Sequence, residues 1–67
     1  MNSSFLTLYN EVIDEHGNVK LCGRDKCKDL IICCMSMNPD NAGSYGDVNT
    51  GIMNVANIVS FKKELFG

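Results

Sequence analysis

The residues with the most specific chemistry in this 67-residue chain are four cysteines, Cys22, Cys27, Cys33 and Cys34. A structural zinc site takes four soft ligands, which often come as two close pairs because a tight knuckle aims both sulfurs at one ion. Here four residues separate the first cysteine from the second, five separate the second from the third, and the third and fourth are adjacent. This spacing does not favour zinc, and we expect no metal and no other cofactor.

Zinc binding remains the first alternative. The ligands would be Cys22, Cys27, Cys34 and His16, if a turn carries the histidine close to the first cysteine. Cys33 could take the place of its neighbour, but adjacent residues lie about 100° apart around a helix and would seldom serve the same ion. The simpler interpretation makes Cys27 and Cys34 small core residues and leaves His16 exposed in a turn.

A thiol switch is the second alternative. Cys27 falls in the first turn of an expected helix, where the helix dipole lowers the pKa of a thiol, and Cys22 just before that helix could bridge to it. A bridge from Cys27 to Cys34 is excluded, since seven helical residues separate their Cα atoms by about 10 Å and a disulfide allows about 7 Å.

The chain contains no residue set for catalysis or for binding a nucleotide. A hydrolase needs a nucleophile, a base and an orienting group, and one histidine in a turn does not supply them. Gly43, Gly46 and Gly51 have neither the spacing nor the lysine of a phosphate-binding loop. We therefore expect a protein that is not an enzyme.

Charge and hydropathy exclude two classes of partner. Six basic against eight acidic residues give a net charge of −2, so no basic face is expected to follow a nucleic acid backbone. The cluster of basic residues at positions 20–28 is interrupted by Asp25 and Asp29. The longest apolar run, residues 30–35, is far shorter than the about 20 residues that span a membrane. No signal peptide is visible, and we expect a cytoplasmic protein with reduced thiols.

The segment from Phe5 to Cys22 fits two structures. As a helix it would place six apolar residues on one broad face: Phe5, Leu6, Leu8, Tyr9, Val12 and Ile13. As a hairpin it would turn at residues 14–17, where Gly17 supplies a positive φ. One side of that hairpin would be apolar except at Asn10. We favour the hairpin, because residues 19–21 need a strand partner and none lies nearer.

Two later segments predict helices. From Asp25 to Met37 apolar residues recur at helical spacing, with Asp25 as the expected N-cap and Pro39 behind the end. The apolar run from Leu30 to Met35 also fits a buried strand, and we favour the helix. From Asn54 to Phe66 a second apolar face follows an asparagine cap. Residues 39–51 between them are rich in turn formers, and we expect Tyr45 to anchor this loop or to begin a short strand.

Lys62 is the exception in the last helix, because it falls within the apolar stripe. Its stem could lie along the core with the charge in water, or the last turn could diverge from the core. The third interpretation is that the ammonium group reaches a carboxylate of a partner.

The predicted fold is a single α+β domain of 67 residues, an N-terminal β-hairpin packed against two helices. The predicted function is that of a small non-enzymatic protein-interaction or regulatory module, such as an inhibitor encoded on a mobile element. A small core makes assembly attractive, so a homodimer is the predicted corollary.

Overall fold

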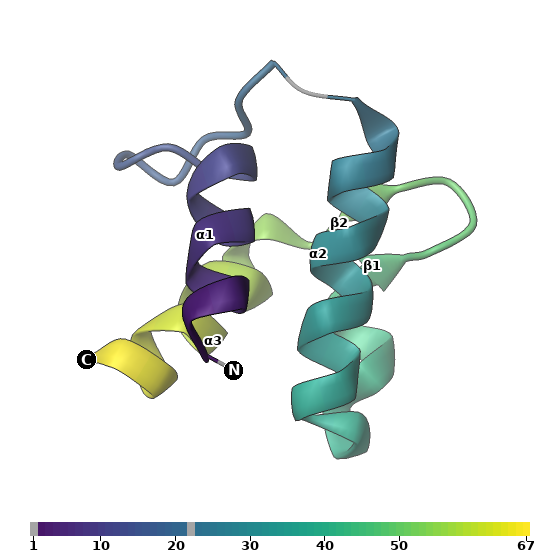
Figure 1. Ribbon diagram of the computed structural model, residues 1–67. Coiled ribbons are helices and arrows are strands. Elements are labelled where there is room, and N and C mark those ends of the chain that lie inside the picture. Colours follow the sequence, from purple (N-terminus) through teal and green to yellow (C-terminus); the bar gives the residue numbers. More distant parts are fainter. Residues whose placement is uncertain (1, 22) are drawn as a thin grey trace.

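The N-terminal segment forms a helix, which corrects the predicted hairpin. The computed structural model describes residues 2–21 and 23–67. It contains α1 (Asn2–Val12), α2 (Arg24–Met37), the 3-10 helix η1 (Pro39–Ser44), the strands β1 (Gly46–Asp47) and β2 (Ile52–Met53), and α3 (Val55–Phe66) (Figure 1). The α+β prediction is therefore wrong. The fold is mostly helical, with a short hairpin between the second and third long helices.

The segment forms a helix and not a hairpin because the helix buries its large apolar side chains. Phe5, Tyr9 and Val12 are all buried, at intervals of four and three residues that place them on one helix face. The residues expected on the apolar side of a hairpin do not share one environment, since Leu6 is half-buried whereas Leu21 is fully exposed. Asn10, which interrupted the hairpin pattern, lies on the exposed side of the helix.

The expected turn at residues 14–17 does exist, but it follows a helix instead of joining two strands. Gly17 has a φ of +81°, which a residue with a Cβ adopts only under strain. A single antiparallel bridge pairs Ile13 with Val19, and the Lys20 amide donates to the Val12 carbonyl at 2.7 Å. This bridge is the part of the predicted hairpin that the structure retains.

The other two helices confirm their predictions, apart from one cap. The N-cap of α2 is Gly23, and Asp25 lies inside the first turn, so the predicted aspartate cap is wrong. The helix ends at Met37, before Asn38 and the proline that follows it, as expected. Asn54 does cap α3, with its side-chain oxygen accepting from the Asn57 amide at 3.3 Å.

Most of the segment 39–51 has regular secondary structure, and Tyr45 anchors it to the core. Tyr45 is buried, and its hydroxyl oxygen accepts a hydrogen bond from the Asn38 side-chain amide at 2.9 Å, so the predicted anchor is confirmed. Directly after it, β1 pairs with β2 in antiparallel register, Gly46 opposite Met53. The predicted short strand is thus present as well.

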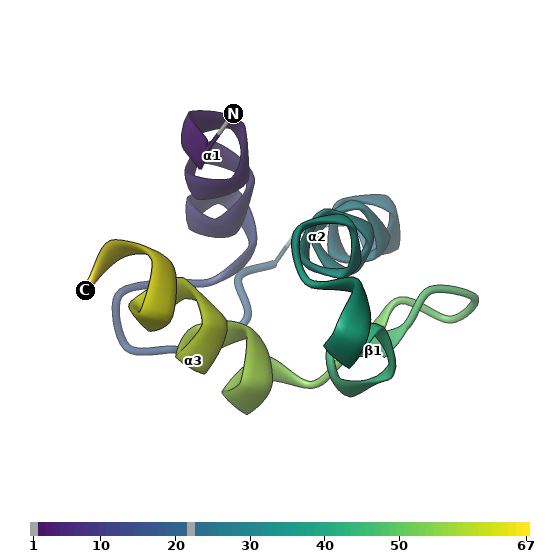
Figure 2. The ribbon, with the colours of Figure 1, turned by 90° about the horizontal axis from the view of Figure 1, so that it is seen from below.

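The core lies where α1, α2 and α3 meet. Figure 2 shows α1 and α3 on one side of α2, with the hairpin on the other side. Phe5 joins the two terminal helices, because its ring lies 5.9 Å from that of Phe61 and 6.2 Å from that of Phe66. An ion pair between Lys26 and Glu11 links α2 to α1. Among the residues described, no helix is long and apolar enough to cross a membrane.

Candidate functional site

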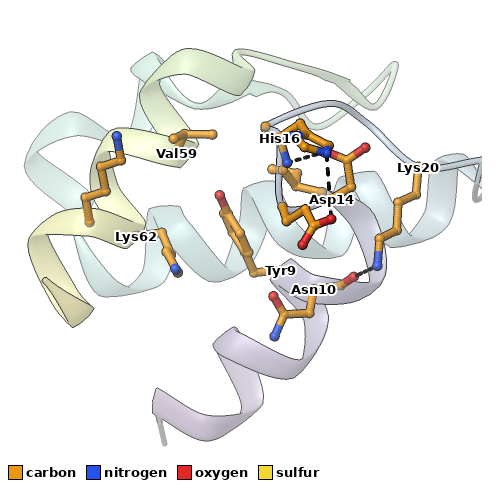
Figure 3. A pocket seen from close by; sticks show the side chains of 11 residues that line it. Tyr9, Asn10, Asp14, His16, Lys20, Val59 and Lys62 are labelled. Carbon is orange, nitrogen blue, oxygen red and sulfur yellow. Dashed lines mark hydrogen bonds and ion pairs between the residues drawn. The ribbon is translucent and has the colours of Figure 1, made fainter.

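A cleft of about 690 Å³ opens between the end of α1 and the middle of α3. In Figure 3 the Tyr9 ring stands between Val59 and Lys62 of α3 on one side and the turn that carries Asp14 and His16 on the other. The cleft is lined by Tyr9, Asn10, Ile13, Asp14, Glu15, His16, Gly17, Lys20, Val59, Lys62 and Lys63. Eleven residues from three segments of the chain thus meet at one opening.

The turn on one side of the cleft is built around the Asp14 carboxylate. Its Oδ1 atom accepts hydrogen bonds from the amides of His16 and Asn18, each at 2.9 Å. The amide of Asn18, and to a lesser extent that of His16, hold the Asp14 pKa below its ordinary value, against the opposing effect of desolvation. The turn is closed by the Gly17 amide, which donates to the Asp14 carbonyl at 3.0 Å.

Lys20 follows the turn and returns to the end of α1. Its ammonium group donates to the carbonyl of Asn10, one of the last carbonyls of the helix. The last carbonyls of a helix have no partner within it and carry the negative end of its dipole, so a lysine there stabilises the helix end. This contact holds the Lys20 charge at the rim of the cleft.

The floor of the cleft is formed by Tyr9, beside the ammonium group of Lys62. The Nζ atom lies 5.6 Å from the centroid of the Tyr9 ring, a cation–π distance. Lys62 is half-buried, so its stem lies along the core and its charge reaches the cleft, the first of the three interpretations given above. The tyrosine is only 7% exposed, and burial raises its pKa. The phenol therefore keeps its proton at neutral pH and remains a hydrogen-bond donor.

The charges at the cleft do not balance. Asp14 is engaged by backbone amides, and the Glu15 carboxylate lies 3.6 Å from the His16 imidazole. Within residues 2–21 and 23–67, neither Lys62 nor Lys63 forms an ion pair with an acidic side chain, and the Tyr9 hydroxyl has no hydrogen-bond partner. The cleft therefore offers a ligand two ammonium groups from α3 and one hydroxyl from α1.

The hydrogen bonds to Asp14 should make the stability of the fold decrease in acid. Because the folded pKa of Asp14 is lowered, its contribution to stability is present above the ordinary carboxyl pKa of about 3.9 and is lost as pH falls through the folded value. Asp14→Asn is expected to be less stable than the wild type at pH 6, with a smaller difference at pH 2.5. Urea denaturation at both pH values measures this. Asp29→Asn, which removes one exposed carboxylate from α2, controls for net charge. A difference in stability that is the same at both pH values would contradict the assignment.

Among the described residues, those of the alternative zinc and thiol sites do not come together. His16 lies exposed at the cleft, whereas Cys27 and Cys34 are buried on α2 and Cys33 is half-buried beside them. In the described part of the chain, no three His, Cys, Asp or Glu side chains gather closely enough to hold a metal ion. The pKa of the Cys34 thiol is raised to about 12, chiefly because the side chain is buried. This disfavours the thiolate form that binds metals.

Cys22 lies outside the described residues. The bridge from Cys22 to Cys27 therefore stays a hypothesis, as does any metal site that includes it. The core position predicted for Cys34 is confirmed, since this side chain is completely buried against the other core residues.

Sequence reasoning missed Tyr9 and Lys63 as members of a site. Tyr9 was expected only on the apolar face of its segment, and it becomes part of a cleft because side chains of α3 lie beside it. Lys62 gave the one usable signal, a charge within an apolar stripe. No protein-family model, curated protein or solved structure significantly matches this chain.

Proposed function

We propose that this chain is a small non-enzymatic protein-interaction module, a regulator or inhibitor that binds its partner through the cleft between α1 and α3. The observation that carries the proposal is the pair of lysines on α3 that line the cleft together with Tyr9, and that the described residues leave without acidic partners. Such groups gain their counterparts from a second molecule.

The titratable groups of the cleft favour binding over catalysis. A general base works best with a pKa near the working pH. The pKa of Asp14 is shifted down and that of Tyr9 up, so one is a weak base and the other a weak nucleophile at neutral pH. The proposed location is the cytoplasm, because Cys34 serves as an apolar core residue, as thiols commonly do in reducing compartments.

The test places a photo-crosslinking residue at Asn10, which is exposed on α1 and lines the cleft. The matched control carries the same group at Asp29, which is exposed on α2 and does not line the cleft. Irradiation in extracts of the source cells should yield a discrete protein adduct from position 10 and not from position 29. Excess unmodified chain should abolish that adduct, and its mass distinguishes a second copy of this chain from another protein.

Two results would contradict the proposal. Equal adducts from both positions, or none from position 10, would remove the cleft as a protein-binding site. A covalent change in the partner that depends on this chain, seen by mass spectrometry after incubation without light, would contradict the non-enzymatic assignment.

A further inference from the structure

We infer that the cleft recognises an acidic peptide segment in which carboxylates flank an apolar side chain. This inference rests on the proposed function and adds the chemistry of the partner. It follows from the way in which charge and apolar surface are divided within the cleft.

The cationic groups lie on two opposite sides of the cleft. Lys62 and Lys63 line the α3 side, and Lys20 lies at the end of α1, where its ammonium group holds the Asn10 carbonyl. Figure 3 shows Lys20 and Lys62 on either side of the Tyr9 ring. A ligand that spans the cleft therefore meets two lysines at the α3 end and, at the other end, Lys20 in the neighbourhood of the Asp14 carboxylate.

Between the lysines the lining of the cleft is mixed, since Ile13, Val59 and the Tyr9 ring are apolar and the side chains of Asn10, Asp14 and His16 are polar. Ile13 is buried and Val59 half-buried at its wall, and the ring of Tyr9 forms the floor. The Tyr9 hydroxyl points into the opening in Figure 3. It can donate to a carboxylate oxygen, and a hydrogen bond to a charged acceptor is stronger than one between neutral groups.

The size and the charge of the cleft favour a peptide over a nucleic acid. About 690 Å³ lies within the range of about 300–1,000 Å³ that small-ligand pockets occupy, enough for a few side chains. Asp14 and Glu15 on the same rim, together with a net charge of −2, would repel a continuous row of phosphates. Separate carboxylates can contact the lysines and avoid both acidic side chains.

The test is an NMR titration of the isotope-labelled whole chain with the blocked peptide acetyl-Glu-Glu-Phe-Glu-Glu-amide. We expect saturable shifts at residues that line the cleft, and at least about a tenfold weaker affinity for the matched peptide with glutamine in place of glutamate, since several partly exposed ion pairs of up to about 1 kcal/mol each are lost. Raising the salt from 50 to 300 mM should weaken binding of the acidic peptide.

Matched variants assign the binding to the α3 lysines. Lys62→Gln with Lys63→Gln should reduce affinity about tenfold, and Tyr9→Phe about fivefold, because the latter removes only the hydroxyl. Arg24→Gln with Lys28→Gln removes the same charge from α2 and should change affinity less than twofold. The spectrum of each free variant reports whether its fold is retained.

Three outcomes would overturn the inference. They are equal binding of both peptides, equal losses in the two double variants, and tighter binding of a single-stranded thymidine oligonucleotide than of the acidic peptide. The crosslink at position 10 separates this failure from failure of the proposed function. A protein adduct that survives Lys62→Gln with Lys63→Gln, without peptide binding, would leave the interaction module standing and remove the acidic partner.

Discussion

Replacing Phe5 with alanine is expected to destabilise the protein by about 3–5 kcal/mol, the usual cost of truncating a buried aromatic side chain. Phe5 is completely buried, and its ring contacts three others, those of Tyr9, Phe61 and Phe66. Two of these lie on α3, so the substitution opens a cavity at the crossing of the terminal helices. Chain length alone predicts a total stability of roughly 3–10 kcal/mol, of which this loss is a large part.

Chemical denaturation monitored by circular dichroism measures the Phe5→Ala effect. Thr7→Ala is the matched control, because Thr7 is exposed on the same helix and its truncation should change stability by less than about 0.5 kcal/mol. If Phe5→Ala fails to fold, Phe5→Leu keeps most of the volume and should show a smaller loss in the same direction. A loss below 1 kcal/mol for Phe5→Ala would contradict the core assignment.

The N-terminal helix shows where sequence reasoning fails in this chain. Its apolar residues match two periods at once, because Leu6, Leu8 and Val12 fit alternation and Phe5, Tyr9 and Val12 fit a helix face. The choice depends on whether Phe5 finds a buried site. That site is formed by Phe61 and Phe66, at the far end of the chain, and local sequence carries no record of such a contact.

The other helices could be predicted because their signals are local. Asn38 before a proline ends α2, and the Asn54 side chain caps α3, both within a few residues of the boundary they define. The N-terminal boundary of α2 was less certain, since an aspartate in the first turn stabilises a helix whether or not it is the cap. The predicted boundary differs from the observed one by one or two residues.

The cleft was only partly predictable for the same reason. Lys62 stood out because it breaks an apolar stripe, and a lysine in such a position must bring its charge to the surface. Which surface it reaches is decided by the crossing of α1 and α3, which puts Tyr9 beneath it. The cysteines were candidate ligands and redox groups because of their residue type, yet the described ones pack in or against the core along α2.

Gly46→Ala is expected to be as damaging as a large truncation in the core. Gly46 has a φ of +138°, and a methyl group there would lie 2.5 Å from the Ile52 carbonyl oxygen and 2.9 Å from the Met53 Cα atom. Both are backbone atoms of the paired strand and cannot rotate away. Backbone strain of about 1–3 kcal/mol and overpacking of about 1–3 kcal/mol predict a total loss of roughly 2–6 kcal/mol.

Gly43→Ala is the matched control for this substitution. An added methyl group at Gly43 meets nothing within 4 Å, and its φ is not positive, so alanine there should be neutral or stabilising by up to about 1 kcal/mol. Urea denaturation compares the two variants, and equal stability would contradict the hairpin register. The effect of Gly46→Ala should also reach α3, because the Asn54 amide donates to the carbonyl of Tyr45, directly before Gly46, at 2.9 Å, and Asn54 caps that helix. A displaced hairpin therefore moves the start of the helix that carries the cleft lysines.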